Sequence, residues 1–167
     1  MRILKRAVFC VGMATGLANL MLCCKYNELP GATDAGLFEQ VASPSGYVYF
    51  NGGLLLAPDP ASPHGYFKLR FNDIATSALD ANGRLPVGSI FPNGSILVKE
   101  VYDGGNLVLY AIMRKDPSNP DASNAWLWAE LGPAGETAFT VKRRGDGCVS
   151  CHGTSPNRDL TRTFDLH

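Results

Sequence analysis

The sequence predicts an α+β fold that is rich in β-structure, with an antiparallel sheet and a few short helices. Eighteen glycines and eleven prolines are spread along the 167 residues, which favours turns and short elements over long helices. Two apolar runs flank Asp103-Gly104-Gly105, and this pattern is typical of a β-hairpin. A third run alternates, with Phe67, Leu69 and Phe71 on one face of the expected strand. Together these patterns predict a sheet of neighbouring antiparallel strands.

Each element has its own signal. Residues 34–41 (DAGLFEQV) begin with an acidic cap and carry apolar residues on one side, which predicts a helix of two turns. Residues 47–56 are expected to be partly extended, with a kink at Gly52-Gly53. Residues 65–71 form the alternating strand, and Asn72 or Asp73 then caps a short helix expected to reach about Asp80. The hairpin strands occupy residues 95–102 and 106–114, and a further strand covers residues 125–131.

The composition excludes several classes of protein. Hydrophobic residues make up 46% of the chain and charged residues 18%, which excludes a disordered tail, a coiled coil and a basic nucleic-acid binder. The length suits one domain. Three of the 15 basic residues precede residue 25, so the rest of the chain carries three more acidic than basic residues. We therefore expect no nucleic-acid partner.

The first 24 residues have the layout of an export signal. The basic stretch MRILKR is followed by residues 7–24, which carry no charge. These 18 residues also lie at the lower limit of a membrane-spanning helix, so a retained anchor is an alternative. The ending Leu20-Met21-Leu22-Cys23-Cys24 is similar to a lipoprotein signal, so a lipid tether is a second alternative to a cleaved export signal. In each case we expect a domain at residues 34–167, in the periplasm or otherwise outside the cytoplasmic membrane, after a linker at residues 25–33.

The cysteine spacing near the C-terminus is the most specific chemical signal. Cys148-Val149-Ser150-Cys151-His152 is the Cys-x-x-Cys-His sequence to which a c-type haem is attached. Two thiols three positions apart can reach the two vinyl groups on one edge of the porphyrin, and the adjacent histidine then supplies the iron ligand. Haem c is attached outside the cytoplasm, which agrees with an export signal. The motif predicts one covalently bound haem c with His152 as the metal ligand.

Two other interpretations of the cysteine pair agree less well with the sequence. A structural zinc site needs four ligands, and beyond residue 24 the chain offers only the two cysteines and three histidines. His152 follows Cys151 directly, which is an awkward position for sharing one tetrahedral ion. A thioredoxin-type redox pair occurs in a βαβ context near the start of the fold, whereas this pair lies near the end of a β-rich chain.

The second axial position of the iron decides what a haem does. An electron carrier needs a second strong ligand, usually Met or His. Beyond residue 24 the candidates are Met113, His64 and His167. Met113 falls within a hairpin strand where core packing is expected, His64 lies in a loop and is expected to face solvent, and His167 is expected to fray. The sequence therefore predicts an open iron site.

Lys99 is the unusual residue of the first hairpin strand. It shares a face with Leu97 and Val101, whereas Glu100 lies on the other face, and both faces are largely apolar. One interpretation places Lys99 and Glu100 where the strand emerges into solvent. The other places the Lys99 ammonium against a haem, where desolvation lowers its pKa and makes the neutral amine available as a nucleophile.

Several segments resemble the cytochrome P-460 and cytochrome c-prime-beta family of c-type monohaem proteins. The resemblance covers most of the chain, from about Leu37 to Phe164. Its most specific part is Phe91-Pro92-Asn93-Gly94-Ser95-Ile96-Leu97-Val98-Lys99-Glu100, combined with a haem motif close to the C-terminus. The other matching segments are Leu37-Phe38-Glu39, Pro63-His64-Gly65, Phe71-Asn72-Asp73-Ile74-Ala75, Met113-Arg114-Lys115 and Trp126-Leu127-Trp128, with Gly153 and Asp159 after the motif.

The resemblance implies a β-rich homodimer whose haem has one histidine ligand and an open or loosely occupied second side. In the cytochrome P-460 branch the lysine that matches Lys99 is covalently joined to the porphyrin, and the enzyme oxidises hydroxylamine. In the c-prime-beta branch no such bond forms, and an apolar cap covers a site for nitric oxide or other diatomic gases. The stretch from Phe67 to Phe71 is the candidate cap, and Arg70 is the candidate for the distal arginine of the family.

These observations lead to one expectation and two alternatives. We expect an exported monohaem c-type cytochrome whose five-coordinate iron oxidises hydroxylamine or a related small nitrogen compound, or reacts with nitric oxide. Lys99 is the candidate catalytic residue, and the candidate cofactor-binding residues are Cys148, Cys151, His152, Lys99, Phe67, Leu97 and Val101. The alternatives are a gas-binding cytochrome without turnover and a six-coordinate electron-transfer cytochrome, whose redox partner the sequence does not identify.

Overall fold

The computed structural model describes residues 32–167. The expected export signal and nearly all of the expected linker lie outside these residues. Within residues 32–167, no helix combines the length and the apolar character that crossing a bilayer requires.

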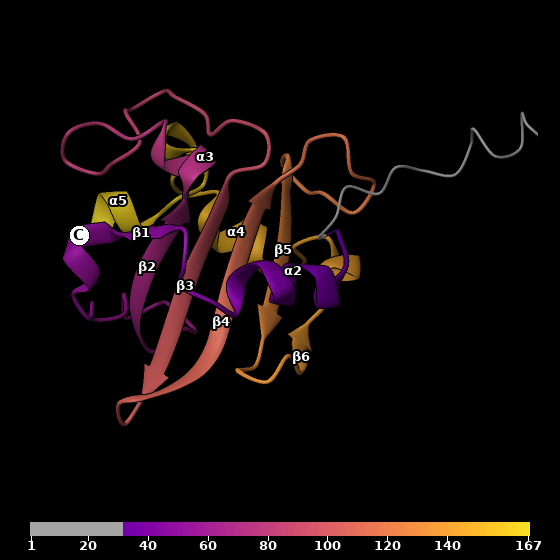
Figure 1. Ribbon diagram of the computed structural model, residues 1–167. Coiled ribbons are helices and arrows are strands. Elements are labelled where there is room, and N and C mark those ends of the chain that lie inside the picture. Colours follow the sequence, from indigo (N-terminus) through magenta and orange to yellow (C-terminus); the bar gives the residue numbers. More distant parts are fainter. Residues whose placement is uncertain (1–31) are drawn as a thin grey trace, which may run out of the picture.

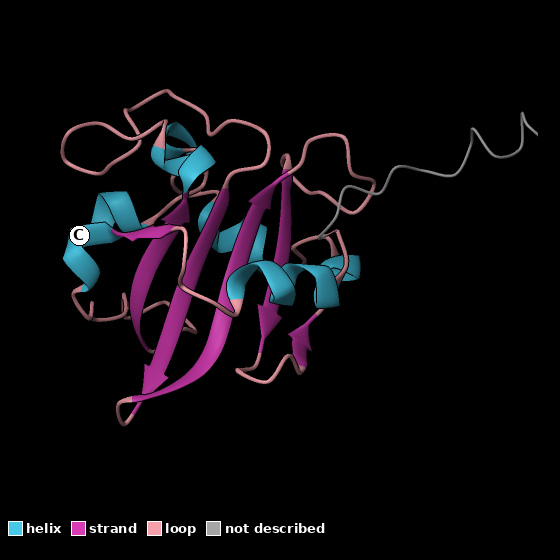
Figure 2. Ribbon diagram, in the orientation of Figure 1, coloured by secondary structure: helices cyan, strands magenta, loops and turns pink. Residues whose placement is uncertain are grey.

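A six-stranded sheet forms the centre of the molecule, and every neighbouring pair of strands is antiparallel (Figures 1 and 2). The strands follow one another in sequence order: β1 (Tyr47–Tyr49), β2 (Tyr66–Asn72), β3 (Ile96–Asp103), β4 (Asn106–Lys115), β5 (Trp126–Leu131) and β6 (Thr137–Phe139). This arrangement confirms the α+β, β-rich class. Because consecutive strands pair, each connection is a hairpin turn or a loop that joins the ends of two neighbouring strands.

The hairpin between β3 and β4 forms where the sequence predicts it. Gly104 and Gly105 have φ values of 54° and 84°, which only glycine adopts without strain, and they form the two-residue turn. The turn pairs Asp103 with Asn106, and a β-bulge between Val101 and Tyr102 then shifts the register by one residue, so that Lys99 pairs with Ala111 and Leu97 with Met113.

Short helices surround the sheet, and two of them differ from the sequence prediction. They are α2 (Asp34–Val41), α3 (Asp73–Thr76), α4 (Cys148–His152), α5 (Thr163–Leu166) and the 3₁₀ turns at Phe50–Gly53, Val141–Arg143 and Pro156–Arg158. The cap of α2 is Thr33, whose hydroxyl accepts from the Gly36 backbone, so the predicted acidic cap is wrong. Helix α3 ends at Thr76 and not at about Asp80, because the chain then continues in tight turns closed by i→i+3 hydrogen bonds.

The two faces of the sheet bury different partners. Figure 1 shows α2 across one face and α4 and α5 on the other. The apolar residues of α2, Leu37 and Val41, pack on β3, β4 and β5 through the side chains of Ile96, Val98, Ile112, Ala129 and Leu131. The opposite face is aromatic and packs against the C-terminal segment, with Phe67, Phe71, Phe91, Trp126, Trp128 and Phe164 in one cluster. Only this second face carries the Cys-x-x-Cys-His segment, Cys148–His152.

A buried ion pair occupies the α2 face. Arg70 is fully buried, and its Nε atom lies 2.7 Å from Glu100 Oε1. The same guanidinium donates to the carbonyl oxygens of Val41 and Ser43, so it holds the C-terminal end of α2 on the sheet. Arg70 therefore lies on the opposite side of the sheet from the Cys-x-x-Cys-His segment, so its candidacy as a distal arginine is wrong.

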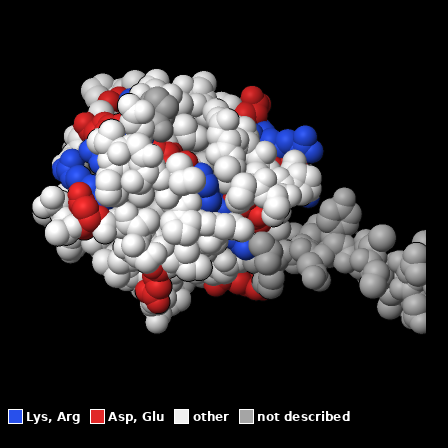
Figure 3. Space-filling view, turned by 90° about the horizontal axis from the view of Figure 1, so that it is seen from above, with Lys and Arg blue, Asp and Glu red and all other residues white. Residues whose placement is uncertain are grey.

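Charged side chains are sparse on the molecular face that Figure 3 presents. They form small groups of both signs separated by uncharged surface. Neither sign forms a continuous patch on this face.

Candidate functional site

The Cys-x-x-Cys-His motif forms α4, a helix of little more than one turn (Cys148–His152). Two glycines precede it with positive φ, Gly145 at 69° and Gly147 at 85°. A Cβ atom at Gly145 would lie 2.6 Å from Cδ1 of Trp128, so only glycine lets the chain approach this ring. The Gly145 carbonyl then accepts hydrogen bonds from the Cys148 and Val149 backbones, which starts the helix directly above β5.

His152 is held in one tautomer by the backbone. Its Nδ1 atom lies 2.8 Å from the carbonyl oxygen of Leu160, which can only accept, so Nδ1 carries the proton and Nε2 keeps its lone pair. The Trp128 ring packs edge-on against the imidazole, with the ring centroids 4.9 Å apart. Burial, followed by the charges of Lys99 and Arg162, lowers the pKa of His152 to about 4, although the Leu160 hydrogen bond opposes this shift. The imidazole is therefore neutral at pH 7, as a metal ligand must be.

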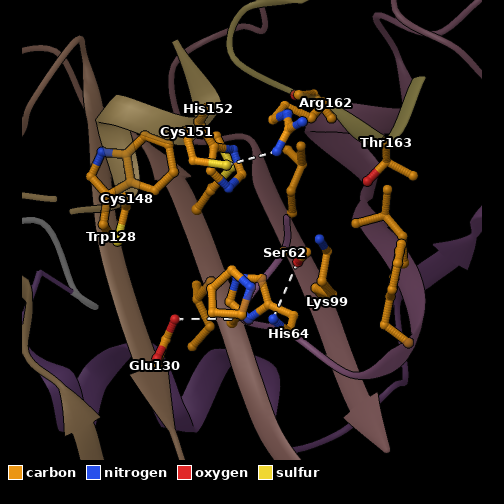
Figure 4. Close-up of a pocket in the computed structure, with 18 of the residues that line it drawn as sticks. Ser62, His64, Lys99, Trp128, Glu130, Cys148, Cys151, His152, Arg162 and Thr163 are labelled. Atoms are coloured by element: carbon orange, nitrogen blue, oxygen red, sulfur yellow. Dashed lines mark hydrogen bonds and ion pairs between the residues drawn. The ribbon is translucent and has the colours of Figure 1, made fainter. Parts of the chain in front are cut away.

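The two cysteines are unpaired thiols in different surroundings. Burial, assisted by the charge of Glu130, raises the pKa of Cys148 to about 11, so this group is a protonated thiol at neutral pH. Cys151 Sγ accepts a hydrogen bond of 2.7 Å from Nη1 of Arg162 (Figure 4). Arg162 also lies 3.7 Å from Asp59, so it ties α4 to the loop at residues 59–64.

A cavity of about 540 Å³ lies between the aromatic face of the sheet and the C-terminal segment. Cys148, Cys151 and His152 all line it. Figure 4 shows Cys151, His152 and Arg162 in one half of the view, with His64 and Glu130 in the other. The volume falls within the range of about 300 to 1,000 Å³ that is typical of small-molecule and cofactor sites.

The register of the sheet sets which side chains line the cavity floor. Leu69 pairs with Lys99, Lys99 with Ala111, and Ala111 with Glu130, so these four residues form one row across β2 to β5. The next row consists of Phe71, Leu97, Met113 and Trp128. The only ionisable groups of the two rows are Lys99 and Glu130, separated by the small side chain of Ala111. The floor is thus apolar apart from one amine and one carboxylate.

Lys99 lines the cavity and does not emerge into solvent. Its Nζ atom lies 4.2 Å from the centroid of the Phe67 ring, a cation–π contact. Burial, then the charge of Arg162, lowers the pKa of Lys99 to about 8, and the Cys151 and Glu130 charges oppose this shift only in part. A substantial fraction of Lys99 is therefore a neutral amine just above neutral pH.

Two histidines lie in the cavity where the sequence predicts neither. The structure corrects the expectation that His64 faces solvent: its side chain is 13% exposed, and its Nδ1 atom lies 3.9 Å from Glu130 Oε1. Burial, followed by the charges of Lys99 and His152, lowers the pKa of His64 to about 4. His167 also lines the cavity, with its ring 5.7 Å from that of Phe67, and Arg84 donates to its carbonyl oxygen. The expected fraying of His167 is not what the structure has.

Of the remaining candidate cofactor-binding residues, some line the cavity and one does not. Phe67 and Leu97 line it. Val101 is buried on the same face of β3, where it pairs with Phe67, but it does not line the cavity. Met113 is 8% exposed and belongs to both the aromatic core and the cavity wall, so it packs as expected and also borders the site.

Sequence reasoning also missed Glu130, Trp128 and Arg162, which line the cavity. The first two had a signal, because Trp126, Trp128 and Glu130 alternate along one strand and must share a face. A carboxylate at the end of an aromatic row is unusual for a core face. No comparable signal exists for Arg162, which lies in an irregular segment.

The donor chemistry of the cavity is compatible with a covalently attached haem. Two thiols and one neutral imidazole border a largely apolar cavity from a single short helix. Within residues 32–167, no group of three or more His, Cys, Asp or Glu side chains is arranged to hold a bare metal ion. A haem needs no such group, because its porphyrin supplies four of the iron ligands.

No protein-family model matches this chain, and a search of curated proteins finds no match either. The resemblance to the cytochrome P-460 and c-prime-beta family therefore depends on the motifs quoted for it.

Proposed function

We propose that this protein is an exported monohaem c-type cytochrome whose iron reacts with a small nitrogen compound, by oxidising hydroxylamine or by reacting with nitric oxide. One observation carries the proposal: the two thiols and the imidazole of the Cys-x-x-Cys-His motif border the same cavity as Lys99. A motif that occurred by chance would have no reason to border a cavity of cofactor size, with its histidine fixed in the ligating tautomer.

Each residue of α4 has a defined task in this proposal. Cys148 and Cys151 would each add their S–H across one vinyl group, which forms two thioethers and needs no oxidant. His152 would ligate the iron through Nε2 while Leu160 keeps the proton on Nδ1. The bound haem would supply an iron that accepts electrons and binds a small ligand.

The opposite part of the cavity supplies groups that can bind and deprotonate a small polar substrate. The Lys99 amine, whose pKa is lowered to about 8, can donate or accept a hydrogen bond. Burial raises the pKa of Glu130 above its ordinary value, although the nearby charges of Arg143 and Lys99 oppose the shift. Glu130 and His64 face one another at 3.9 Å, so a proton released in the cavity has two neighbouring acceptors. Phe67 and Leu69 give this part of the cavity an apolar wall.

Two alternatives use the same cavity. A gas-binding cytochrome of the c-prime-beta type needs only the apolar wall, to which Phe67 belongs. A six-coordinate electron carrier needs Met113 or His64 as second ligand, and both line the cavity. His64 is the stronger rival, because Met113 is also packed in the aromatic core.

Haem attachment tests the proposal directly. We expect the chain, matured with haem, to retain the haem through acid–acetone extraction, because thioethers survive this treatment. Cys148→Ala should leave one thioether and weaken retention, whereas Ser150→Ala, within the same helix, should not. Haem that extracts freely from the matured wild-type chain would end the proposal.

The ligation state separates the proposal from the electron-carrier alternative. We expect a high-spin ferrous spectrum and rapid binding of carbon monoxide or nitric oxide, because the second axial position is open. A low-spin ferrous spectrum that His64→Ala or Met113→Ala converts to high spin would establish the electron carrier. Turnover of hydroxylamine then distinguishes the enzyme from the gas binder.

Location and assembly are part of the same proposal. We expect the haem-loaded protein outside the cytoplasm, with its N-terminus processed at or shortly before Lys25, and as a homodimer, as the resemblance implies. N-terminal sequencing and light scattering measure these properties. Recovery of intact Met1 on the haem protein would favour an uncleaved anchor, and a lipidated Cys23 or Cys24 would establish a lipid tether.

A further inference from the structure

The segment after α4 supplies the carbonyl oxygen to which His152 donates. This segment leaves regular helix geometry at two consecutive residues, Asp159 with φ of 47° and Leu160 with φ of 68°. Both values lie in the left-handed region, which costs a non-glycine residue about 1–3 kcal/mol. Such a conformation persists only where the surrounding contacts determine it. At Asp159 and Leu160 these contacts are made by the Asp159 carboxylate.

The Asp159 carboxylate is anchored to the sheet by three donors. Its two oxygens lie 2.7 and 2.8 Å from Nζ of Lys115, the last residue of β4. The Phe91 backbone donates to Oδ2 at 2.9 Å, and the Trp126 indole donates to Oδ1 at 3.3 Å. Asp159 is 8% exposed and Lys115 is 6% exposed, so the pair is buried. A buried carboxylate with an ammonium and two N–H donors has little freedom to move.

Lys115 is itself fixed in the sheet. Its backbone N–H donates to Ser95 at 2.8 Å, and its carbonyl oxygen accepts from Gly94 at 2.9 Å. Its Nζ atom also lies 4.7 Å from the Trp126 ring centroid. The contacts of Asp159 thus connect a strained loop to the end of β4, one residue before the carbonyl that His152 uses.

We propose that Asp159, held by Lys115, is a positioning residue for His152 that acts through the Leu160 carbonyl. The ion pair keeps the chain at Asp159 and Leu160 in its left-handed conformation, and this conformation directs the Leu160 oxygen to Nδ1 of His152. The consequence for the iron rests on the proposed function, whereas the consequence for the His152 tautomer does not.

The proposal has a spectroscopic consequence. Donation from Nδ1–H to a carbonyl makes Nε2 a more basic ligand, which favours the ferric state and strengthens the iron–histidine bond. When the Leu160 oxygen is no longer held, the reduction potential should rise and the iron–histidine stretch should move to lower frequency. In the haem-free chain, His152 should change from the Nδ1–H tautomer alone to a mixture of both.

The test compares two buried ion pairs on opposite faces of one sheet. Asp159→Asn removes the charge that Lys115 requires, and Lys115→Met/Asp159→Asn removes the pair without leaving a buried unpaired charge. Glu100→Gln is the matched control, because it breaks the buried Arg70–Glu100 pair on the α2 face, far from the haem motif in the fold. The readouts are ¹⁵N spectra of the histidines in the full haem-free chain, and resonance Raman spectra and potentials of the haem-loaded chain.

We expect both Asp159 variants to show the mixed tautomer, the lower stretch frequency and the higher potential, and Glu100→Gln to show none of these. Unchanged His152 signals in the double variant, or equal changes in Glu100→Gln, would overturn the positioning role. If haem fails to attach to the wild-type chain, the proposed function fails, and the tautomer of the haem-free chain still decides the role of Asp159.

Discussion

Lys99 and Glu100 are adjacent charged residues on one strand, and the sheet gives them opposite surroundings. Glu100 is fully satisfied, because Arg70 pairs with it and the Tyr49 and Tyr102 hydroxyls donate to it. Lys99 has no ion-pair partner among residues 32–167, and its Nζ atom lies over the face of the Phe67 ring. An amine without a carboxylate partner loses charge readily when it is buried, which is why its pKa falls to about 8.

The residue-scale prediction concerns this amine. If the chain has cytochrome P-460 chemistry, peroxide treatment of the haem-loaded protein should join Lys99 to the porphyrin and move the ferrous Soret band far to the red. Lys99→Arg should abolish this band shift, because a guanidinium stays protonated and is not a nucleophile at neutral pH. Absorption spectra and mass spectrometry of the haem peptide measure the two effects. An ordinary c-type Soret band with unmodified Lys99 would favour the gas-binding alternative.

At the scale of elements, the position of α4 depends on how closely Gly145 approaches Trp128. The Trp128 ring occupies the space that a side chain at residue 145 would need, and the same ring packs against His152. The Trp128 indole also donates to the Ser123 carbonyl oxygen at 3.2 Å, which restrains the ring. One glycine and one tryptophan of β5 thus fix the position of the helix that carries the Cys-x-x-Cys-His segment.

Two glycine variants separate the free-energy cost of backbone strain from the cost of a steric contact with Trp128. Gly145→Ala should lower the free energy of unfolding by about 2–4 kcal/mol, because it adds overpacking to the cost of a positive φ. Gly147→Ala is the control: its φ of 85° also disfavours a residue with a Cβ atom, but a Cβ there meets nothing within 4 Å, so only about 1–2 kcal/mol should be lost. Urea unfolding measures both. Equal losses would mean that Trp128 does not set the position of α4.

At the scale of the whole molecule, the sheet separates two kinds of buried charge. The α2 face holds the closed Arg70–Glu100 pair, whereas the cavity face holds, besides the Lys115–Asp159 pair, His64, Lys99, Glu130 and His152 around one cavity. Burial in the cavity lowers the pKa values of His64, Lys99 and His152 and raises that of Glu130. Acid should act on the fold mainly through them.

His64 provides the test of this acid sensitivity. The unfolded chain binds a proton at His64 below about pH 6.5, and the folded chain does so only below about pH 4. Between these values the unfolded state holds more protons, so stability should fall as the pH falls, by at most about 3 kcal/mol from this group. His64→Gln should reduce the loss of stability between pH 6.5 and 4. Unfolding curves that keep the wild-type pH dependence in this variant would contradict the burial of His64.

Local patterns of the sequence were sufficient to predict part of this structure. The β3–β4 hairpin depends on two adjacent glycines, and the separation of Lys99 from Glu100 depends on the two-residue period of a strand. The cysteine motif is also local, since five consecutive residues place two thiols and an imidazole on one turn. In each case neighbours in the chain determine the geometry, so no knowledge of distant packing is needed.

Which residues line the cavity follows only from the tertiary structure. Glu130 reaches the row of Lys99 because β4 pairs with both β3 and β5 in a particular register, and that register depends on the whole sheet. His64 enters the cavity from a loop, whose course follows from what it packs against. Arg70, a single residue from the cavity-facing Leu69, lies on the opposite face, where Glu100 compensates its charge. Burial and pairing of charge are properties of the folded assembly of strands, and periodicity along one strand cannot specify the partner on another.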